Sequence, residues 1–427
     1  MASLRALPGF AVGPSGTLSA HPGAWHRPTH GHWVKQLSLE KRDATIAEPI
    51  IRELEQRCRF LSDVGLNYLT LDRAGNTLSG GESQRVRLAS QLASELCGVL
   101  YVLDEPTIGL HPSDNEQLLA ALNRLRSNGN TVVVVEHDRA TMEQADLIID
   151  MGPGGGKTGG SIVAMGTLSD ITKNSNSLTG RWLNSPAPPV RAERDYPDDF
   201  IELKSATMHN LQDLNVRFPC ARFSVVTGVS GSGKTTLVRK VLEPQLKQQL
   251  KKKKTLQIGN NTFIKRVVEV DQSPIGRTPR STPTTYVGIM SDIRKLFAQL
   301  PDSKVRGYTA SRFSFNVKGG RCDTCNGQGA VNLEMAFLPN TFVPCETCSG
   351  HRYNSETLRV TYRGHSIADV LEATVDEALT LFEAQPRIRK TLELMTDLGL
   401  GYLTLGQASN TLSGGEAQRI KLVSELR

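Results

Sequence analysis

The spacing of apolar and polar residues separates a short leader from a long globular remainder. Residues 1–38 are rich in Gly, Pro, Ser and His and have neither a helical nor a strand period, so we expect a disordered leader. From residue 39 onward, short apolar runs such as "TVVVV" at 131–135 predict buried strands. No apolar run approaches the roughly 18 residues that a membrane span needs, so we expect no integral membrane protein.

An internal repeat organises the globular part. Residues 64–92 match residues 398–426 at a constant offset of 334 positions. Between the copies, residues 184–199 concentrate Pro and charge, which is typical of an interdomain linker. We therefore expect an α/β protein of two modules, residues 39–183 and 200–427.

Charge and cysteine content narrow the class only modestly. The 427 residues include 50 Lys and Arg against 43 Asp and Glu, and the net charge of +7 makes a polyanionic partner plausible. Four of the seven cysteines form two CxxC pairs, which favours zinc in a reducing compartment over disulfides. Pro and Gly interrupt the first residues where a signal peptide needs an apolar core, so we expect a cytoplasmic protein.

A phosphate-binding loop is the strongest single motif. The apolar run "FSVVTG" predicts a strand, the G-x-x-x-x-G-K-[ST] motif follows it, and a helix comes next. Backbone N–H groups of such a loop wrap a phosphate, the lysine offsets negative charge and the threonine hydroxyl can bind Mg²⁺. The candidate ATP-binding residues are Gly228, Ser230, Gly231, Ser232, Gly233, Lys234, Thr235 and Thr236.

Two further strands end in candidate catalytic residues. The run "VLYVLDEP" places Asp104 and Glu105 at a strand tip, where one carboxylate can hold Mg²⁺ with its water shell and the next can orient or deprotonate a water. His137 follows the next strand, where it can sense a γ-phosphate. A lone histidine at a strand end is more often structural, but the βαβ pattern with Asp104 favours the functional interpretation.

Each repeat copy contains "LSGGE" at the start of an amphipathic helix. Alone, this is an ordinary helix N-cap with a glutamate in the first turn. Duplicated beside a phosphate loop, it resembles the signature of ABC-type ATPases, in which the signature of one module closes over ATP held by the other. The resemblance implies nucleotide contacts from Ser79, Gly80, Gly81, Ser413, Gly414 and Gly415, and a coupling role for Gln272.

Four cysteines predict a zinc module at about residues 319–354. Cys322, Cys325, Cys345 and Cys348 form CxxC-x19-CxxC, a spacing that suits tetrahedral thiolate coordination. A redox pair is the alternative interpretation. Between the pairs, "AVNLEMAFLPNTFVP" predicts a hairpin. Basic residues nearby could neutralise phosphates as a group, although each alone is more typical of a plain surface charge: Arg277, Arg280, Arg306, Arg312, Lys318 and Arg321.

Motifs along residues 38–427 together resemble the UvrA family, the damage-sensing ATPases of bacterial nucleotide excision repair. They include "LDEPTIGLHPSDN", "VVEHD", "IDMGPGGGKTGG", "VDQSPIGRTPRSTPTTY", "CETCSGHRYN" and "GYLTLGQASNTLSGGEAQRIKL". The resemblance implies ATP, Mg²⁺ and Zn²⁺ as cofactors, two ABC modules with an inserted zinc module, binding of damaged double-stranded DNA as a homodimer, and loading of UvrB. A UvrA-like ATPase of drug resistance or export and a non-catalytic zinc-bearing DNA-binding fragment are the alternatives.

The motif order also predicts incomplete modules. No phosphate loop precedes the first signature, and the Asp-Glu strand of the second copy would lie beyond Arg427, so we expect a partial UvrA-like sequence without the UvrB-binding region. Head-to-tail pairing would set Lys234 opposite Ser79, and Glu105 and His137 opposite Ser413. Each composite ATP site would be half built. A pairing of Lys234 with Glu105 would require the two sheets to merge, which we do not expect.

Overall fold

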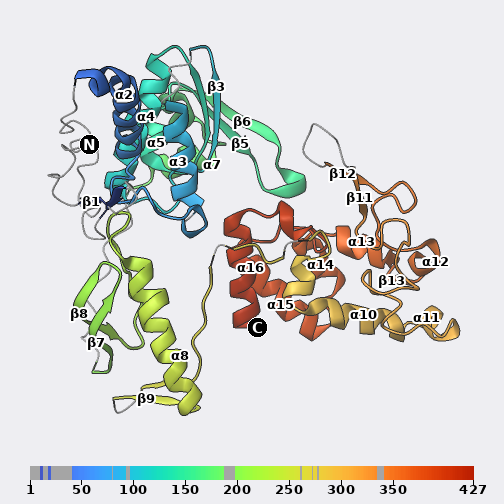
Figure 1. The fold of residues 1–427 in the computed structure, drawn as a ribbon. Coiled ribbons are helices and arrows are strands. Elements are labelled where there is room, and N and C mark those ends of the chain that lie inside the picture. The colour runs from blue at the N-terminus through green and yellow to red at the C-terminus, as the bar shows by residue number, and fades with distance from the viewer. Residues whose placement is uncertain are drawn as a thin grey trace. The chain divides into compact units, whose positions relative to one another are not determined.

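A computed structural model shows an α/β protein (Figure 1). It describes residues 10–12, 18–20, 41–78, 80–92, 97–186, 198–259, 262–271, 273–276, 278–333 and 341–427. Ser79, Gln272, Arg277 and most of the predicted leader and linker lie outside these residues. The chain divides into two compact units, one of residues 1–148, 166–174 and 179–267, the other of residues 149–165, 175–178 and 268–427. The division at 184–199 that the sequence predicts stays a prediction.

The first unit contains a two-stranded parallel sheet with helices packed on one face. Strand β3 (Leu100–Asp104) pairs in parallel with β4 (Thr131–Val135), and helix α4 (Pro112–Ser127) connects them. Apolar side chains of α3 (Gly80–Leu92), α4 and β3 form the core beneath this sheet. The opposite face of the sheet is exposed, because successive side chains of a strand point to alternate faces. Its exposed side chains are Leu100, Val102, Val133 and Val135.

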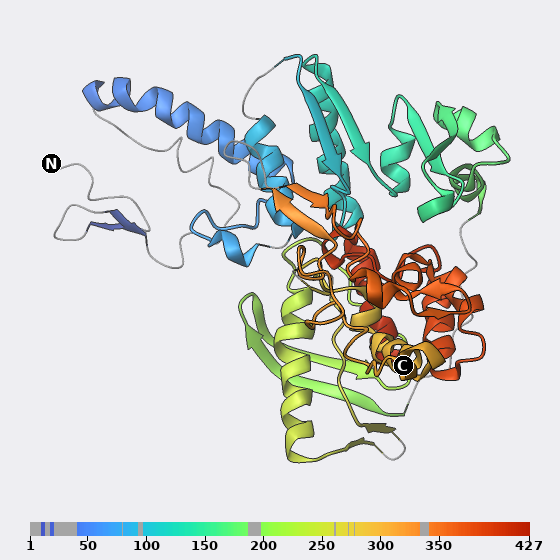
Figure 2. The same cartoon turned by 90° about the vertical axis from the view of Figure 1, so that its right-hand side faces the viewer.

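An antiparallel hairpin and one helix form a second core in the same unit. Strands β7 (Phe200–Met208) and β8 (Leu211–Pro219) pair with each other. In both views the hairpin runs beside the helical segment of a π-helical turn (Thr236–Leu242) and α8 (Glu243–Lys252) (Figure 2). The buried contact is made by Leu203, Leu211 and Leu237. Helix α8 ends within the lysine run at residues 251–254.

The strand predicted before the phosphate loop is wrong. Residues 223–228 have no strand conformation, and Phe223 and Val225 are 93% and 70% exposed. A strand needs a neighbour to satisfy its backbone groups, and the described residues offer this segment no strand partner. Its apolar residues show that the sequence suits a buried strand, but the pairing that would create it is absent from the described chain.

The second unit is mostly helical. Its core joins α10 (Ile289–Gln299), α13 (Ile367–Glu372), α14 (Val375–Leu381), α15 (Pro386–Asp397) and α16 (Gly414–Leu426) around Phe297, Phe313 and Phe382. The predicted hairpin is confirmed: β11 (Ala330–Leu333) pairs antiparallel with β12 (Thr341–Pro344), and residues 334–340 between them lie outside the described part.

The remaining elements are short, apart from one long helix. They are β1 (Phe10–Val12), β2 (Leu18–Ala20), α2 (Lys41–Asp63), α5 (Arg139–Glu143), β5 (Ile148–Gly152), β6 (Ser161–Gly166), α6 (Leu168–Lys173), α7 (Leu178–Asn184), β9 (Leu256–Ile258), β10 (Thr262–Ile264), α9 (Pro283–Tyr286), α11 (Pro301–Val305), α12 (Ser355–Leu358), β13 (Thr361–Tyr362) and β14 (His365–Ser366). Single 3₁₀ turns lie at Gly75–Thr77, Gly156–Thr158 and Ser409–Thr411. Among the described residues, none of the helices combines the length and apolar composition that crossing a bilayer requires.

Candidate functional site

The phosphate loop has the backbone that its glycines predict. Gly228, Gly231 and Gly233 have φ angles of 144°, 76° and 97°, which side chains larger than glycine rarely adopt. Lys234 folds back on the loop, where its Nζ donates to the carbonyls of Gly228 (2.7 Å) and Val229 (2.8 Å). A phosphate bound in this loop would have to displace these carbonyls from Lys234.

Three side chains outside the motif hold this loop. The Nδ2 of Asn210, in the turn between β7 and β8, donates to the Gly231 carbonyl at 3.0 Å. The carboxylate of Asp114, in the first turn of α4, accepts from the Ser230 N–H at 2.8 Å. A Cβ built on Gly231 would lie 2.4 Å from the ring of Tyr68, so only glycine fits there. None of these three residues was predicted from the sequence.

Tyr68 connects the phosphate loop to the first signature. Its hydroxyl donates to the Oε1 of Glu82 at 2.7 Å, and Glu82 lies in the first turn of α3. The phosphate loop of the second module thus lies beside the signature helix of the first module, within one compact unit. Head-to-tail pairing requires this arrangement, although Ser79 itself lies outside the described residues.

The two candidate carboxylates are at the carboxyl end of β3, as predicted. Asp104 is opposite Val135 in the parallel register, and the Glu105 N–H donates to the Val135 carbonyl at 2.9 Å. Glu105 has φ of 45°, a left-handed conformation that is costly for glutamate and common at functional sites. The His137 Nε2 lies 3.5 Å from the Glu105 Oε1, so the two strand tips bring these side chains together.

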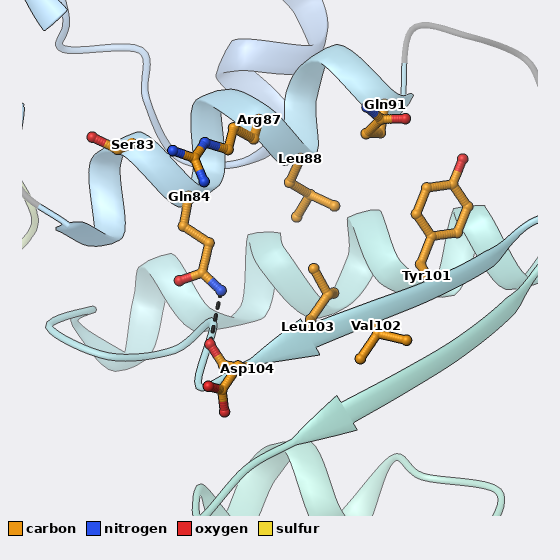
Figure 3. Close-up of a pocket in the computed structure, with 9 residues that line it drawn as sticks. All are labelled: Ser83, Gln84, Arg87, Leu88, Gln91, Tyr101, Val102, Leu103 and Asp104. Carbon is orange, nitrogen blue, oxygen red and sulfur yellow. Dashed lines mark hydrogen bonds between the residues drawn. The ribbon is translucent and has the colours of Figure 1, made fainter. Parts of the chain in front are cut away.

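A cavity of about 570 Å³ opens beside Asp104, between α3 and β3 (Figure 3). Gln84 reaches across it and donates to the Asp104 carbonyl at 2.8 Å. The lining mixes polar and apolar side chains: Ser83, Gln84, Arg87, Leu88, Gln91, Tyr101, Val102, Leu103 and Asp104. The Gln84 hydrogen bond holds the first turns of α3 near the acidic strand tip, and Asp104 is exposed.

The second signature forms a capped helix start. Ser413 is the N-cap of α16, its Oγ accepts from the Glu416 N–H (3.2 Å), and the Glu416 carboxylate accepts from the Ser413 N–H (2.7 Å). A Cβ on Gly414 or Gly415 would meet no atom within 4 Å, so open space lies in front of both. The ordinary capping box that the sequence allows is therefore present, and an anion could still approach the two glycines.

Tyr402 repeats in the second copy what Tyr68 does in the first. Its hydroxyl donates to the Oε1 of Glu416 at 2.6 Å. A Cβ on Gly155 would lie 2.7 Å from its ring, and one on Gly156 would lie 2.8 Å from its carbonyl oxygen. Tyr68 and Tyr402 are related by the repeat offset of 334 positions, and each lies 14 residues before the glutamate it contacts. The repeat itself therefore contained the signal that could have found them.

The segment around Gln272 is fastened to the second signature helix. Lys421, on α16, forms an ion pair with the Asp271 carboxylate and donates to the Ser273 Oγ at 2.7 Å. The hydrogen bond from Lys421, with help from Ser273, lowers the pKa of Asp271 to about 2. Gln272 lies outside the described residues, but both of its neighbours are held against α16.

The four predicted cysteines meet in a buried cluster. We call residues 320–329 and 344–353 the cysteine knuckle. The four sulfurs all lie within 4.8 Å of one another, with Cys322–Cys345 at 4.0 Å and Cys325–Cys348 at 3.7 Å. Tetrahedral Zn–S bonds of about 2.3 Å place sulfurs about 3.8 Å apart, so the cluster fits zinc.

The chemistry of the donor set supports the same fit. Burial raises the pKa of the Cys325 and Cys348 thiols, the latter to about 12. A bound divalent cation would deprotonate such thiols and offset their charge. All four cysteines are free thiols. A redox pair needs only two sulfurs, so the convergence of all four within 4.8 Å favours the metal interpretation.

The basic residues near the knuckle do not form one free patch. Arg312 pairs with Glu356 at 2.8 Å and lies over the Tyr308 ring, and the Arg321 guanidinium donates to Asn326 at 2.7 Å. Arg306 and Lys318 are exposed, Arg280 is partly buried, and Arg277 lies outside the described residues. Two of the predicted phosphate contacts are therefore engaged in internal bonds.

Comparisons with known proteins agree with this arrangement. The chain is 54% identical over 404 residues to the UvrABC system protein A of Streptococcus pyogenes serotype M1, covering 93% of this chain and 43% of the relative. It is 57% identical over 396 residues to the Thermus thermophilus protein of the same name, covering 91% and 42%. The chain thus spans less than half the length of these curated relatives.

A solved structure has the same fold. The crystal structure of UvrA2 from Deinococcus radiodurans aligns with a TM-score of 0.84 at 47% identity, covering 94% of this chain and 49% of that one. No protein-family model matches the chain. The α/β fold with its inserted cysteine module, as predicted from the sequence, is therefore confirmed.

Proposed function

Because this chain is a homologue of UvrA that spans less than half of its curated relatives, we propose that it carries part of a DNA-damage recognition ATPase of nucleotide excision repair. The observation that carries the proposal is the packing of the second module's phosphate loop against Tyr68 of the first module. Tyr68 in turn donates to Glu82 of the first signature. ATP and Mg²⁺ are the cofactors that this arrangement fits.

The chain's own residues can bind the nucleotide in the following way. Lys234 would exchange two loop carbonyls for phosphate oxygens, the N–H groups of Gly231–Thr235 would surround the phosphate, and Thr235 would hold Mg²⁺. The glycine-containing start of α3 would face the terminal phosphate. Asn210 and Asp114 keep the loop in place during this exchange.

Hydrolysis in the complete protein would use the tip of β3. Asp104 would hold Mg²⁺ through its water shell, and Glu105 would orient and deprotonate the attacking water. His137 lies 3.5 Å from Glu105, where it can sense the terminal phosphate and hold the glutamate.

The cysteine knuckle would hold zinc through Cys322, Cys325, Cys345 and Cys348. A structural metal supplies the stability that a module without an apolar core lacks. The knuckle supports the β11–β12 hairpin, which we propose contacts double-stranded DNA through its backbone phosphates.

Other parts of the proposal follow from homology alone. Damaged DNA, UvrB and a second copy of the protein are the proposed partners of the complete protein, in the cytoplasm. A UvrA-like ATPase of drug resistance or export finds no support in the names of the relatives above. A non-catalytic zinc-bearing fragment is likewise less well supported, because the loop, the strand tip and the second signature have suitable geometry.

The proposal is tested by DNA binding. We expect ATP-dependent, salt-sensitive binding of a duplex with a bulky lesion, since phosphate contacts release counterions. Replacing residues 322–348 with a short Gly-Ser linker should weaken duplex binding, and the Lys234→Ala variant should abolish its dependence on ATP. Unaltered duplex affinity after removal of the knuckle would contradict the proposal.

A further inference from the structure

Arg352 belongs to the cysteine knuckle through its backbone. Its φ of 69° is left-handed, a conformation that is uncommon for arginine. In this conformation its carbonyl accepts from the Cys322 N–H at 2.9 Å, and its own N–H donates to the Cys348 sulfur. The backbone of this one residue therefore touches ligands from both CxxC pairs.

The side chain of Arg352 leaves the knuckle and joins two other segments. One terminal nitrogen donates to the Pro279 carbonyl at 3.1 Å and the other to the Gly406 carbonyl at 3.0 Å. The guanidinium lies 5.2 Å from the centre of the Phe315 ring, which supports its plane. A planar fork can serve two carbonyls at once, which a lysine cannot do in the same way.

The two segments that Arg352 joins flank nucleotide motifs. Residues 278–284 follow Gln272, and residues 405–409 precede the signature that begins at Leu412. They are bonded to each other as well: the Ser409 N–H donates to the Ser281 carbonyl at 2.9 Å, and the Thr284 hydroxyl donates to the Leu405 carbonyl at 3.0 Å. Displacing one segment therefore disturbs the other.

We propose that Arg352 is a positioning residue that couples metal binding in the cysteine knuckle to the order of segments 278–284 and 405–409. This inference rests on the proposed zinc site. Bound metal fixes the Cys322 and Cys348 positions, these fix the Arg352 backbone, and the guanidinium then holds both segments. Loss of the metal frees the arginine, and the segments beside Gln272 and the second signature lose a shared anchor.

Hydrogen–deuterium exchange of the full 427-residue chain, with zinc and after chelation, tests the coupling. In the unchanged protein, chelation should raise exchange in peptides covering 278–286 and 404–410 by about tenfold or more, since local opening sets these rates. The Arg352→Gln variant should bind one zinc ion per chain, because no ligand is changed, and both segments should exchange fast with or without the metal. Arg387→Gln, an exposed arginine of α15, should behave as the unchanged protein.

Two results would overturn the proposal. One is zinc-dependent protection of both segments that survives in Arg352→Gln; the other is no effect of chelation on them in the unchanged protein. If Arg352→Gln does not fold, Arg352→Lys takes its place, and full zinc-dependent protection of both segments there would equally contradict the role of the guanidinium. Absence of bound zinc in the unchanged protein would instead refute the metal site itself, which metal analysis detects separately.

Discussion

At the residue scale, two tyrosines organise the signatures without being part of them. Tyr402 packs its ring on Gly155 and binds Glu416, the glutamate that closes the capping box of α16. The ring excludes any side chain at Gly155, while the hydroxyl orients a carboxylate. One residue thus fixes the start of a helix that is proposed to contact phosphate.

Removing the Tyr402 hydroxyl should therefore destabilise the second unit. A hydrogen bond to a charged group contributes about 1.5–3 kcal/mol when partly buried, so Tyr402→Phe should lower the free energy of unfolding by about 1–2 kcal/mol. Urea denaturation measures this difference. Tyr286→Phe, at an exposed position of α9, is the control and should change stability by less than about 0.5 kcal/mol. Equal effects of the two substitutions would contradict the role assigned to Tyr402.

The Asp271–Lys421 pair predicts a pH dependence. The pKa of Asp271, about 2 in the folded protein, lies below the value of about 3.9 expected when unfolded, so folding favours its ionised form. This stabilisation is complete above about pH 4 and is lost as the pH falls toward 2.

Asp271→Asn should accordingly be less stable than the unchanged protein at pH 7, and the difference in urea midpoint should shrink between pH 4 and pH 3. A difference that is the same at both pH values would show that the carboxylate gains nothing from Lys421.

At the element scale, the phosphate loop stands at the end of a segment that lacks its sheet. The sequence predicts a strand at 223–228 because its residues are apolar, but apolar character favours burial only where a partner exists. A substitution in this exposed segment should therefore change the free energy of unfolding much less than a substitution in the buried face of the neighbouring β7–β8 hairpin.

Phe223→Ser should change the free energy of unfolding by less than about 0.5 kcal/mol, since the ring is 93% exposed. Leu203 lies in β7, is 2% exposed and packs on Leu237 of the helical segment that follows the phosphate loop. Leu203→Ala should lower the free energy of unfolding by about 2–5 kcal/mol. The same denaturation experiment compares them. A large loss from Phe223→Ser would mean that the segment is a buried strand after all.

Some of these contacts could be predicted from the sequence and others could not. CxxC spacing predicted the cysteine cluster, because a metal site depends on a few local ligands at short spacing. Strand tips predicted the meeting of Glu105 with His137, because parallel neighbours end at the same edge of a sheet. The contacts of three residues were not predicted, because the local sequence pattern contains no signal for partners so far along the chain. The partner of Asn210 is 21 positions away, that of Asp114 is 116 positions away, and the two partners of Arg352 are 73 and 54 positions away.

At the scale of the whole molecule, the two compact units do not follow the two sequence modules, residues 39–183 and 200–427. The glycine-rich segment at 153–160 belongs to the first module but packs on Tyr402 and pairs Lys157 with Glu377 at 2.8 Å in the second unit. The phosphate loop belongs to the second module but packs on Tyr68 in the first unit. Each module thus contributes a glycine-rich segment that lies near the signature of the other module.

Equilibrium binding of a fluorescent ATP analogue with Mg²⁺ tests whether the phosphate loop of the second module, packed on Tyr68 of the first, binds nucleotide through Lys234. Lys234→Ala should weaken binding about tenfold or more, because a charge-assisted bond worth about 1.5–3 kcal/mol is lost. Lys251→Ala, at the exposed end of α8, and Glu105→Gln should both leave it nearly unchanged. Equal affinity of the Lys234→Ala variant and the unchanged chain would show that Lys234 does not bind the nucleotide.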